Sequence, residues 1–231
     1  MQSIKLKKSL NPGGYIISSF QTVGYISILA TKYLEEKHII KDAGFLELDI
    51  GTPIAVIENG EVGFPIRVYQ ANNSILISSQ FPLSQSSIKN VISAIVDLYK
   101  KYKYKGIICL DGLSIEQGKE NSDIYYTATK NGFQPTGGKK LESGAIIGLN
   151  AELMLRAQVE GIPATILMAE THSDIPDGIA AASLISALAP IGIKVDTTEL
   201  VSQYKKTLEK INQMLKRVPQ KEAPKNQELY G

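Results

Sequence analysis

The stretch YIISSFQTVGYISILATKYLEEK, residues 15–37, shows the pattern on which our assignment of the fold rests. Residues 15–19 form a mostly apolar run, which predicts a short buried strand. After Gln21 and Thr22, apolar side chains recur at helical spacing from Val23 to Leu34. A strand that leads through a short turn into an amphipathic helix is the opening of an α/β unit.

The same alternation continues along the chain. Apolar runs predict strands at residues 44–48, 107–110 and 163–168. Periodic apolar positions predict helices that begin near Ser84, Ala151 and Ile179. Because strands alternate with helices, we expect an α/β fold: a three-layer α/β/α sandwich with a mainly parallel sheet covered on both faces.

Two segments interrupt this alternation. Residues 54–79 contain short apolar runs around Asn59-Gly60, a pair that favours tight hairpin turns. They predict an antiparallel meander, a β-hairpin insertion among the α/β units. Residues 114–140 are polar and contain several glycines, which predicts a long excursion with short local structure.

A long helix is predicted to start at Thr197 or Thr198. Its apolar positions follow steps of four and three, close to a heptad seam, and are Leu200, Tyr204, Leu208, Ile211, Leu215 and Val218. A narrow seam of this kind after a complete α/β domain favours a subunit contact in a homo-oligomer. The alternative is that the helix packs back along its own domain.

The composition excludes several classes of protein. The net charge is +2, and the only arginines are Arg67, Arg156 and Arg217, which argues against nucleic-acid partners. The first residues lack a signal peptide's apolar stretch, and no apolar run approaches the roughly 18 residues of a membrane span, so we expect a cytoplasmic protein without a membrane partner. The single cysteine, Cys109, stands in an apolar run and is expected in the core.

Residues that could carry chemistry are sparse. The two histidines, His38 and His172, are far apart in sequence, so neither a metal nor a cofactor site is expected. The segment 137–140 lacks the glycine and the hydroxyl residue that a phosphate-binding loop needs. Acids follow predicted strands or turns, at Asp49, Asp111, Glu170 and Asp177. The sequence does not show which of them meet.

The final residues form a separate segment. Residues 219–231 are polar and include two prolines, a composition that predicts a mobile tail. The tail ends in Leu229, Tyr230 and Gly231, a hydrophobic residue, a tyrosine and a residue expected to bear the free carboxylate. We therefore divide the chain into an α/β domain (1–196), an amphipathic helix (197–218) and a tail (219–231).

The chain resembles the archaeal proteasome assembly chaperone family. The resemblance rests on the order of several stretches: Val23-Gly24 with its helix, IAVIENG at 54–60, PIRVY at 65–69, ICLDG at 108–112, GAIIG at 144–148, LMAET at 167–171, Pro176-Asp177, Ala180–Ala182, and VDT at 195–197 before Leu200. It extends from about residue 15 to 200 and includes the hydrophobic–Tyr–any-residue ending.

This resemblance implies a non-enzymatic, ATP-independent protein without cofactors. In that family such tails dock between α-subunits of the proteasome core particle, so Leu229, Tyr230 and Gly231 would be the partner-binding residues. It also suggests a tetramer, and it leaves open assembly, gate opening and recruitment of unfolded proteins. The alternative is a small-molecule enzyme with a nucleoside-phosphorylase-like core, whose site would lie at the strand ends near Asp111, Glu170 and His172.

Overall fold

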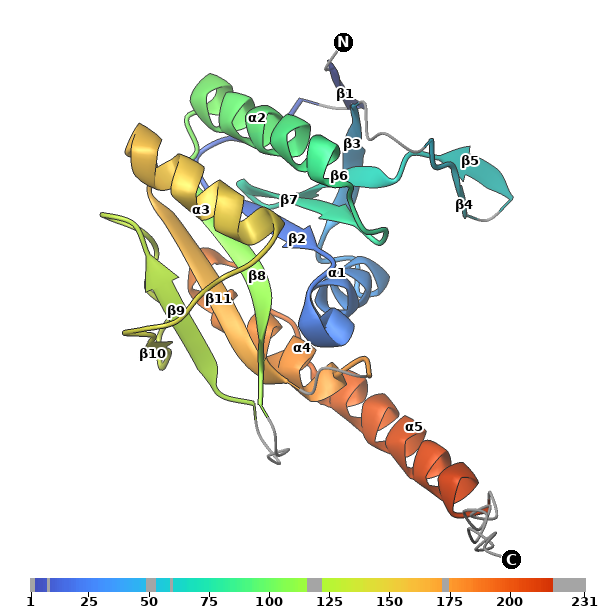
Figure 1. Cartoon of the computed structure of the whole chain (residues 1–231). Coiled ribbons are helices and arrows are strands. Elements are labelled where there is room, and N and C mark those ends of the chain that lie inside the picture. The colour runs from blue at the N-terminus through green and yellow to red at the C-terminus, as the bar shows by residue number, and fades with distance from the viewer. Residues whose placement is uncertain are drawn as a thin grey trace, which may run out of the picture.

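The computed structural model describes residues 3–7, 9–48, 53–58, 60–115, 122–171 and 175–217. Within these ranges, strands and helices alternate around one large sheet (Figure 1). The sheet holds nine described strands in the order β1-β3-β6-β7-β2-β8-β11-β9-β10. Their bounds are β1 Ser3–Leu6, β2 Tyr15–Phe20, β3 Lys41–Glu47, β6 Ile66–Ala71, β7 Ser74–Ser79, β8 Gly106–Ser114, β9 Ile124–Ala128, β10 Lys139–Lys140 and β11 Ala164–Thr171.

The centre of the sheet is parallel, as the sequence predicted. Strands β7, β2, β8 and β11 are neighbours and run in one direction. On one flank β1, β3 and β6 pair antiparallel, and on the other flank β9 is antiparallel to β11. Every residue of β11 and of β7 is buried, as are the first five residues of β8, because helices cover both faces there.

Helices form the two outer layers (Figure 1). Helices α2 (Gln85–Tyr102) and α3 (Leu149–Glu160) cover one face, and α1 (Ile26–Glu36) and α4 (Gly178–Ala187) cover the other. Short 3-10 helices precede α1 (Val23–Tyr25) and follow α4 (Ala189–Ile191). The predicted three-layer α/β/α arrangement is therefore confirmed.

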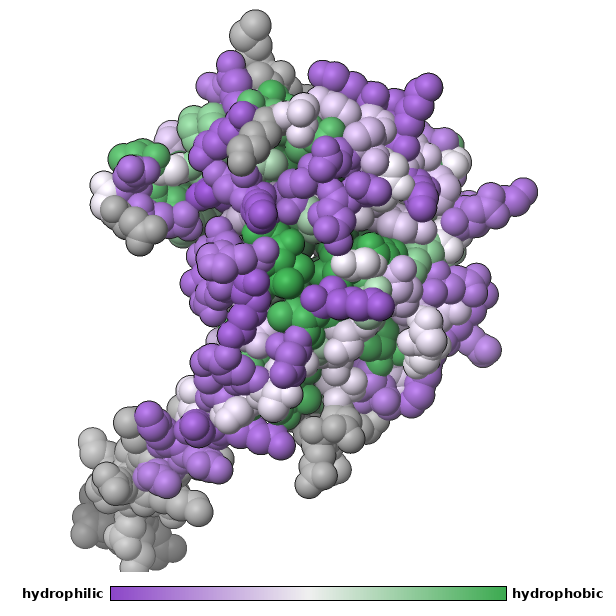
Figure 2. Space-filling model, turned by 180° about the vertical axis from the view of Figure 1, so that it is seen from behind, coloured by the Kyte–Doolittle hydropathy of each residue, from purple (hydrophilic) through white to green (hydrophobic). Residues whose placement is uncertain are grey.

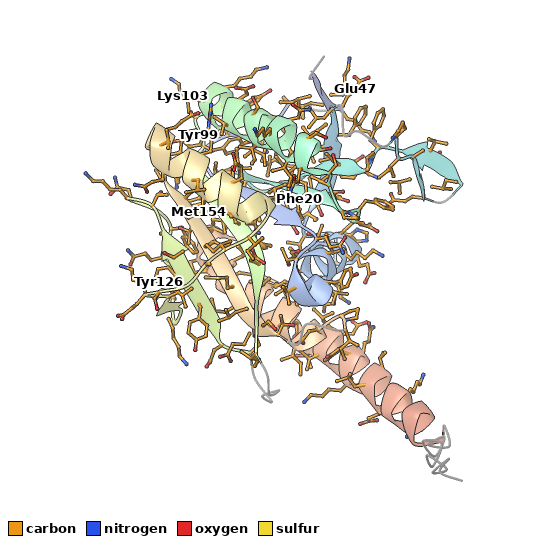
Figure 3. All side chains as sticks on the ribbon, in the orientation of Figure 1. Phe20, Glu47, Tyr99, Lys103, Tyr126 and Met154 are labelled. Atoms are coloured by element: carbon orange, nitrogen blue, oxygen red, sulfur yellow. The ribbon has the colours of Figure 1, made fainter. Side chains whose placement is uncertain are left out.

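Successive side chains of a strand point alternately into the two core layers. Ile16 of β2 lies in the core under α2 and α3, and Ile17 lies in the core under α1 and α4. From the helices, Tyr99 of α2 and Met154 of α3 point between the helices and toward the sheet (Figure 3). Cys109 is fully buried, as expected from its apolar run.

Polar contacts join β2 to α1. The Ser19 hydroxyl donates to the Ser27 carbonyl oxygen at 2.9 Å and lies 2.7 Å from the Thr31 hydroxyl. The turn between the two elements requires left-handed backbone, with φ of 65° at Gly24 and 52° at Tyr25. Glycine adopts this conformation without strain, so Gly24 lets the chain reverse from strand to helix within a few residues.

Two expectations need correction. Residues 54–79 are not one meander, because β4 (Val56–Glu58) and β5 (Glu61–Gly63) form a separate two-stranded hairpin, whereas β6 and β7 join the main sheet. The excursion 114–140 contributes β9 to the main sheet next to β11. All five residues of β9 are only half-buried, and the strand stands within a polar segment, so it was not separated from the rest of the excursion.

The hairpin and the last helix, α5 (Thr198–Arg217), both project from the body on the same side (Figure 2). The surface between them is hollowed and shows hydrophobic residues at its centre (Figure 2). Within the described ranges, no helix has both the length and the apolar character needed to cross a membrane.

Candidate functional site

The predicted helical seam is carried by α5, whose start is held by contacts to α1. The Asp196 carboxylate accepts hydrogen bonds from the Thr198 N–H (2.9 Å) and hydroxyl (2.6 Å), and these bonds lower the pKa of Asp196. The Asp196 carbonyl oxygen accepts the Tyr33 hydroxyl at 2.7 Å. Lys37, at the end of α1, pairs with Glu199 at 2.5 Å. These contacts fix the direction in which α5 leaves the domain.

The beginning of α5 packs on α4. Leu200 is buried in the core of its own chain, together with the alanines of α4. The backbone of Gly178 lies so close to Tyr204 that a Cβ at Gly178 would stand 2.7 Å from the Tyr204 Cβ. Burial, and next the charge of Asp177, raise the pKa of Tyr204 to about 12. Leu200 thus has little surface left for a subunit contact.

The rest of α5 extends away from the domain (Figure 1). Tyr204 and Leu208 are half-buried, so part of each remains accessible. Ile211 and Leu215 belong to α5, but their side chains fall outside the described part of the chain. Val218 and the tail residues Leu229, Tyr230 and Gly231 also lie outside the described residues. The seam and the tail therefore remain predictions from the sequence.

Among the described strand-end acids, Asp111 and Asp177 each make structural hydrogen bonds of their own. Asp111, near the end of β8, is engaged by structural hydrogen bonds: Oδ2 accepts from Asn150 Nδ2 at 3.0 Å, and Oδ1 accepts from the Gly112 N–H at 2.8 Å. Asn150 also donates to the Leu110 carbonyl oxygen (3.1 Å) and accepts from the Ser18 hydroxyl (3.4 Å). Burial raises the pKa of Asp111, and these bonds offset part of that effect. The network ties α3 to β2 and β8.

The other described acids lie on β11 and at the start of α4. Glu170 is buried in β11, where its register partner on β8 is Leu113, whereas Asp111 pairs with Met168. Asp177 caps α4, accepting from the N–H groups of Ile179 and Ala180 at 3.0 Å each. His172 and Asp49 lie outside the described residues. A catalytic group of Asp111, Glu170 and His172 is therefore not seen in the described part of the chain.

A pocket of about 390 Å³ opens at the carboxyl ends of β2 and β7, the usual place for ligands in parallel sheets. It is lined mainly by apolar residues: Phe20, Gln21, Thr22, Val23, Phe81, Pro82, Leu83, Ile88, Gly148 and Leu149. None of these side chains is titratable, so the pocket itself offers no acid or base. Among the described residues, no group of histidine, cysteine or acidic side chains is arranged to hold a metal ion.

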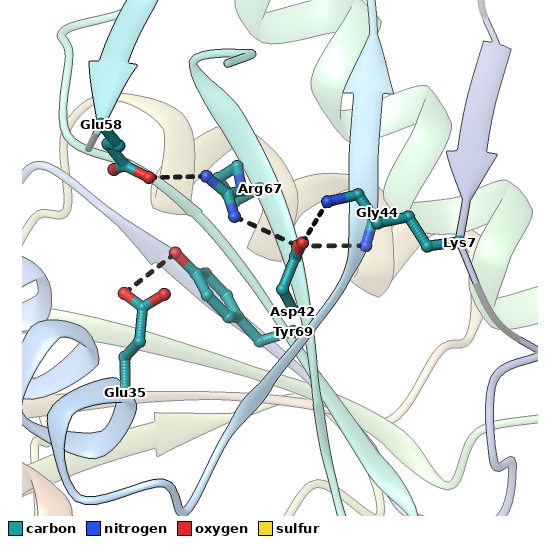
Figure 4. Close-up of polar contacts among 7 residues, drawn as sticks. All are labelled: Lys7, Glu35, Asp42, Gly44, Glu58, Arg67 and Tyr69. Carbon is teal, nitrogen blue, oxygen red and sulfur yellow. Dashed lines mark hydrogen bonds and ion pairs between the residues drawn. The ribbon is translucent and has the colours of Figure 1, made fainter. Parts of the chain in front are cut away.

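Sequence reasoning missed a charged network beneath the β4–β5 hairpin (Figure 4). Arg67 of β6 bridges Glu58 of the hairpin (2.8 Å) and Asp42 of β3 (3.3 Å), and Lys7 contacts Asp42 at 2.5 Å. Burial acts to raise the pKa of Asp42, but Lys7 and Arg67 together bring it below its usual value. Charged residues this far apart in sequence carry no signal that they meet. The network anchors the hairpin to the sheet.

Beside this network, Tyr69 donates its hydroxyl proton to Glu35 of α1 at 3.4 Å (Figure 4). Burial raises the pKa of both groups, because it disfavours the charged form of each. The pair links α1 to the antiparallel flank of the sheet. Arg67 lies over the Tyr69 ring, 5.8 Å from its centroid, so the pair adjoins the charged network.

Comparison with known proteins finds relatives in sequence and in structure. An uncharacterized protein of Methanocaldococcus jannaschii is 22% identical over 205 residues, which cover 86% of this chain and 84% of that protein. Two solved structures from Pyrococcus furiosus are similar. PbaA, an archaeal homolog of proteasome-assembly chaperone, matches with a TM-score of 0.80 and 22% identity over 92% of each chain. PbaB, an archaeal proteasome activator, matches with a TM-score of 0.76 and 17% identity over 93% of this chain and 98% of PbaB.

At these identities, the structural likeness establishes the fold alone. The family assignment comes from the sequence, which matches the PAC2 family over residues 16–215. That match begins in β2 and ends in α5, and so includes both core layers and the described start of the seam. The chain therefore belongs to the PAC2 family.

Proposed function

We propose that this protein is a non-enzymatic, ATP-independent chaperone or activator that binds the proteasome core particle. The observation that carries the proposal is the fold, which it shares over nearly its whole length with PbaA, a proteasome-assembly chaperone homolog, and with PbaB, a proteasome activator. The structural role of Asp111 and Asp177 and the apolar strand-end pocket support a binding protein over an enzyme.

The binding element in this proposal is the ending Leu229-Tyr230-Gly231. Leu229 fills the edge of an apolar pocket between α-subunits, Tyr230 anchors in that pocket, and the carboxylate of Gly231 pairs with a lysine. A buried aromatic anchor is worth about 2 kcal/mol or more in an interface. A single tail loses conformational freedom when it docks, so one tail alone binds weakly.

In this proposal, the predicted seam beyond Leu200 brings several tails together. In the proposal, Tyr204, Leu208, Ile211, Leu215 and Val218 of neighbouring copies pack together in a homo-oligomer, with four copies as the working stoichiometry. Linking several weak tails raises the overall affinity by about 10²- to 10⁴-fold. In the oligomer, the α/β domains would then determine the distance between neighbouring tails.

The test is binding of the purified full chain to the core particle of its own organism. We expect the wild type to bind, and we expect Tyr230→Ala and a variant lacking residues 229–231 to lose most of that binding. Adding one residue after Gly231 displaces the carboxylate and should also weaken binding. The matched control is Gln227→Ala, which changes the polar part of the tail and leaves the last three residues intact.

Native mass spectrometry measures the oligomeric mass of each sample. A tail variant with fewer copies per oligomer would bind less tightly because it carries fewer tails, even if each tail could still dock. Equal binding by the wild type and the tail variants contradicts the tail mechanism. Absence of binding by the wild type contradicts the proposed function itself.

A further inference from the structure

Exposed lysines gather where α2 ends and the central strands β8 and β11 begin. We call this surface the basic edge, and its members are Lys100, Lys101, Lys103, Lys105 and Lys130, all of them exposed. Figure 3 shows Lys103 at the outer end of α2. The apolar pocket described above opens at the carboxyl ends of the parallel strands. The basic edge lies at their other ends and is therefore a separate surface.

The sheet brings Lys105 and Lys130 to the same place. Lys105 directly precedes β8, which pairs with β11. On the other side of β11, Thr129 donates its hydroxyl to the Ile162 carbonyl oxygen (2.8 Å) and its N–H to the Ala164 carbonyl oxygen (2.9 Å). Because neighbouring strands lie about 4.8 Å apart, the backbones of Lys105 and Lys130 are about 10 Å apart.

Positive charge exceeds negative charge at this edge. The last two turns of α2 and α3 contain two acids, Asp97 and Glu160. Lys100 and Arg156 both pair with Glu160, and Asp97 stands one turn before Lys101, where it can balance that charge. The other three lysines of the basic edge form no ion pair with any residue that the structure describes. They are the unbalanced cations.

Lys103 has an unusual backbone conformation. It caps the C-terminus of α2 with φ 52° and ψ 47°, in the left-handed region. Glycine is the usual residue in such a position, because a Cβ is strained there. The helix dipole explains lysines in the last turn, at 100 and 101, but it does not call for a strained lysine after it. Backbone strain of this kind collects at functional positions, which indicates a use for the charge of Lys103.

We propose that the basic edge binds an acidic peptide segment of a partner protein. The unpaired Lys103, Lys105 and Lys130 each contact a carboxylate of that segment. A lysine ammonium is a compact charge on a flexible stem, so it meets a carboxylate in many orientations. The contact therefore selects acidic character and spacing, and it speeds the encounter with a partner of opposite charge.

The choice of lysine favours carboxylates over phosphates as the partner groups. Arginine is the side chain whose planar fork binds phosphate with two parallel hydrogen bonds. The arginine at this edge, Arg156, is engaged by Glu160. Nucleic acids and anionic lipids present phosphates, so an acidic peptide fits the basic edge better than either. The binding does not depend on the proposed function.

The test measures binding of the purified full chain to a fluorescent peptide of alternating glutamate and serine, by fluorescence anisotropy. We expect saturable binding that weakens as salt is added. Lys103→Glu combined with Lys105→Glu should weaken it about tenfold or more. The matched control combines Lys32→Glu with Lys89→Glu, two exposed lysines of α1 and of the first half of α2. It changes the net charge equally and should bind almost as the wild type does.

Lys103→Gly separates the charge from the fold. Glycine relaxes the left-handed backbone, so the melting temperature should not fall, whereas peptide binding should weaken. The proposal is overturned if the wild type does not bind the peptide, or if the two double variants lose binding equally. Unchanged binding by Lys103→Gly also contradicts it. So does tighter binding of single-stranded DNA or of phosphatidylglycerol vesicles at the same salt concentration. No proteasome is present, so each result leaves the tail mechanism to its own test.

Discussion

Helices α4 and α5 follow each other in the chain and pack against each other, yet they are held in different ways. Helix α4 is rich in alanine, and most of its residues are buried between the sheet, α1 and α5. Helix α5 is twice as long and largely polar, and among its side chains that the structure describes only Leu200, at its start, is buried. Helix α4 is therefore held by close packing along its length, whereas α5 is held by a few contacts at one end. Substitutions in α4 should change the stability of the domain, and substitutions farther along α5 should change association.

The largest contrast should come from equivalent truncations in the two helices. Leu184→Ala in α4 removes a fully buried side chain, and we expect it to lower the free energy of unfolding by about 2–5 kcal/mol. Leu208→Ala in α5 removes a half-exposed side chain and should cost at most about 0.5–1 kcal/mol in the protomer. Urea denaturation measures both values.

The second readout is the oligomeric mass at fixed concentration. We expect Leu208→Ala to lower the mass and Leu184→Ala to leave it unchanged under conditions where the domain stays folded. Equal losses of stability for the two variants would show that α5 packs on its own domain beyond the first turns.

The junction of the two helices should be the next most sensitive point. Gly178→Ala places a Cβ at 2.7 Å from the Tyr204 Cβ, so α5 must shift away from α4. Overpacking of this kind costs about 1–3 kcal/mol. Thermal unfolding measures the cost, and limited proteolysis should cut α5 faster. The matched control is Ser183→Ala, a half-buried position in the same helix. If Gly178→Ala is as stable as the control, the close approach of Tyr204 does not constrain the junction.

A smaller effect is expected at the start of α4. The Asp177 carboxylate accepts two backbone N–H groups of the first turn and the Thr171 hydroxyl. Asp177→Ala removes this cap and should cost about 0.5–2 kcal/mol. Asp177→Asn keeps an acceptor oxygen and should retain most of the stability in the same denaturation assay. If both variants lose the same amount, the negative charge contributes more than the cap geometry.

The smallest effect should be the acid sensitivity of α5. The hydrogen bonds from Thr198 lower the pKa of Asp196 in the folded chain. A depressed carboxyl pKa gives stability that is present above the unfolded value of about 3.9 and is lost as pH falls through the folded value. Hydrogen exchange should therefore show the first turn of α5 opening at low pH before α4 does. In Asp196→Asn the exchange of this turn should no longer change across that pH range.

The core elements could be predicted because their periodicity is strong. The strand at 15–19 and the helix up to Lys37 were found from spacing alone, and the structure has them as β2 and α1. Strand β9 was missed although Ile124, Tyr125 and Tyr126 favour a strand, because its five half-buried residues stand within a long polar segment. Strand β1 was also missed: Ser3–Leu6 alternates polar and apolar residues, as an edge strand does, but four residues are too few for a clear pattern.

Candidate sites were less predictable than elements. Asp111 and Glu170 do lie in neighbouring parallel strands, as their positions suggested, but the partner of Asp111 is Asn150, which is 39 residues away. The exposed pair Ile57–Val62 could have been found, because Asn59-Gly60 predicts a tight hairpin turn, and the structure pairs the two residues. Which side of the hairpin faces solvent depends on the ion pair between Arg67 and Glu58. Only the structure shows this ion pair.

Hydrophobic spacing and turn residues were sufficient for the α/β class, the parallel centre of the sheet and most helices, because these features depend on neighbours within a few residues. The sequence also defines the composition of the tail and the seam positions of α5. The antiparallel flanks, the burial of Leu200 against α4 and the anchoring of the hairpin by Arg67 came only from the folded structure. Each of these depends on contacts between distant residues, and the local periodicity of a segment does not specify which distant segment it meets.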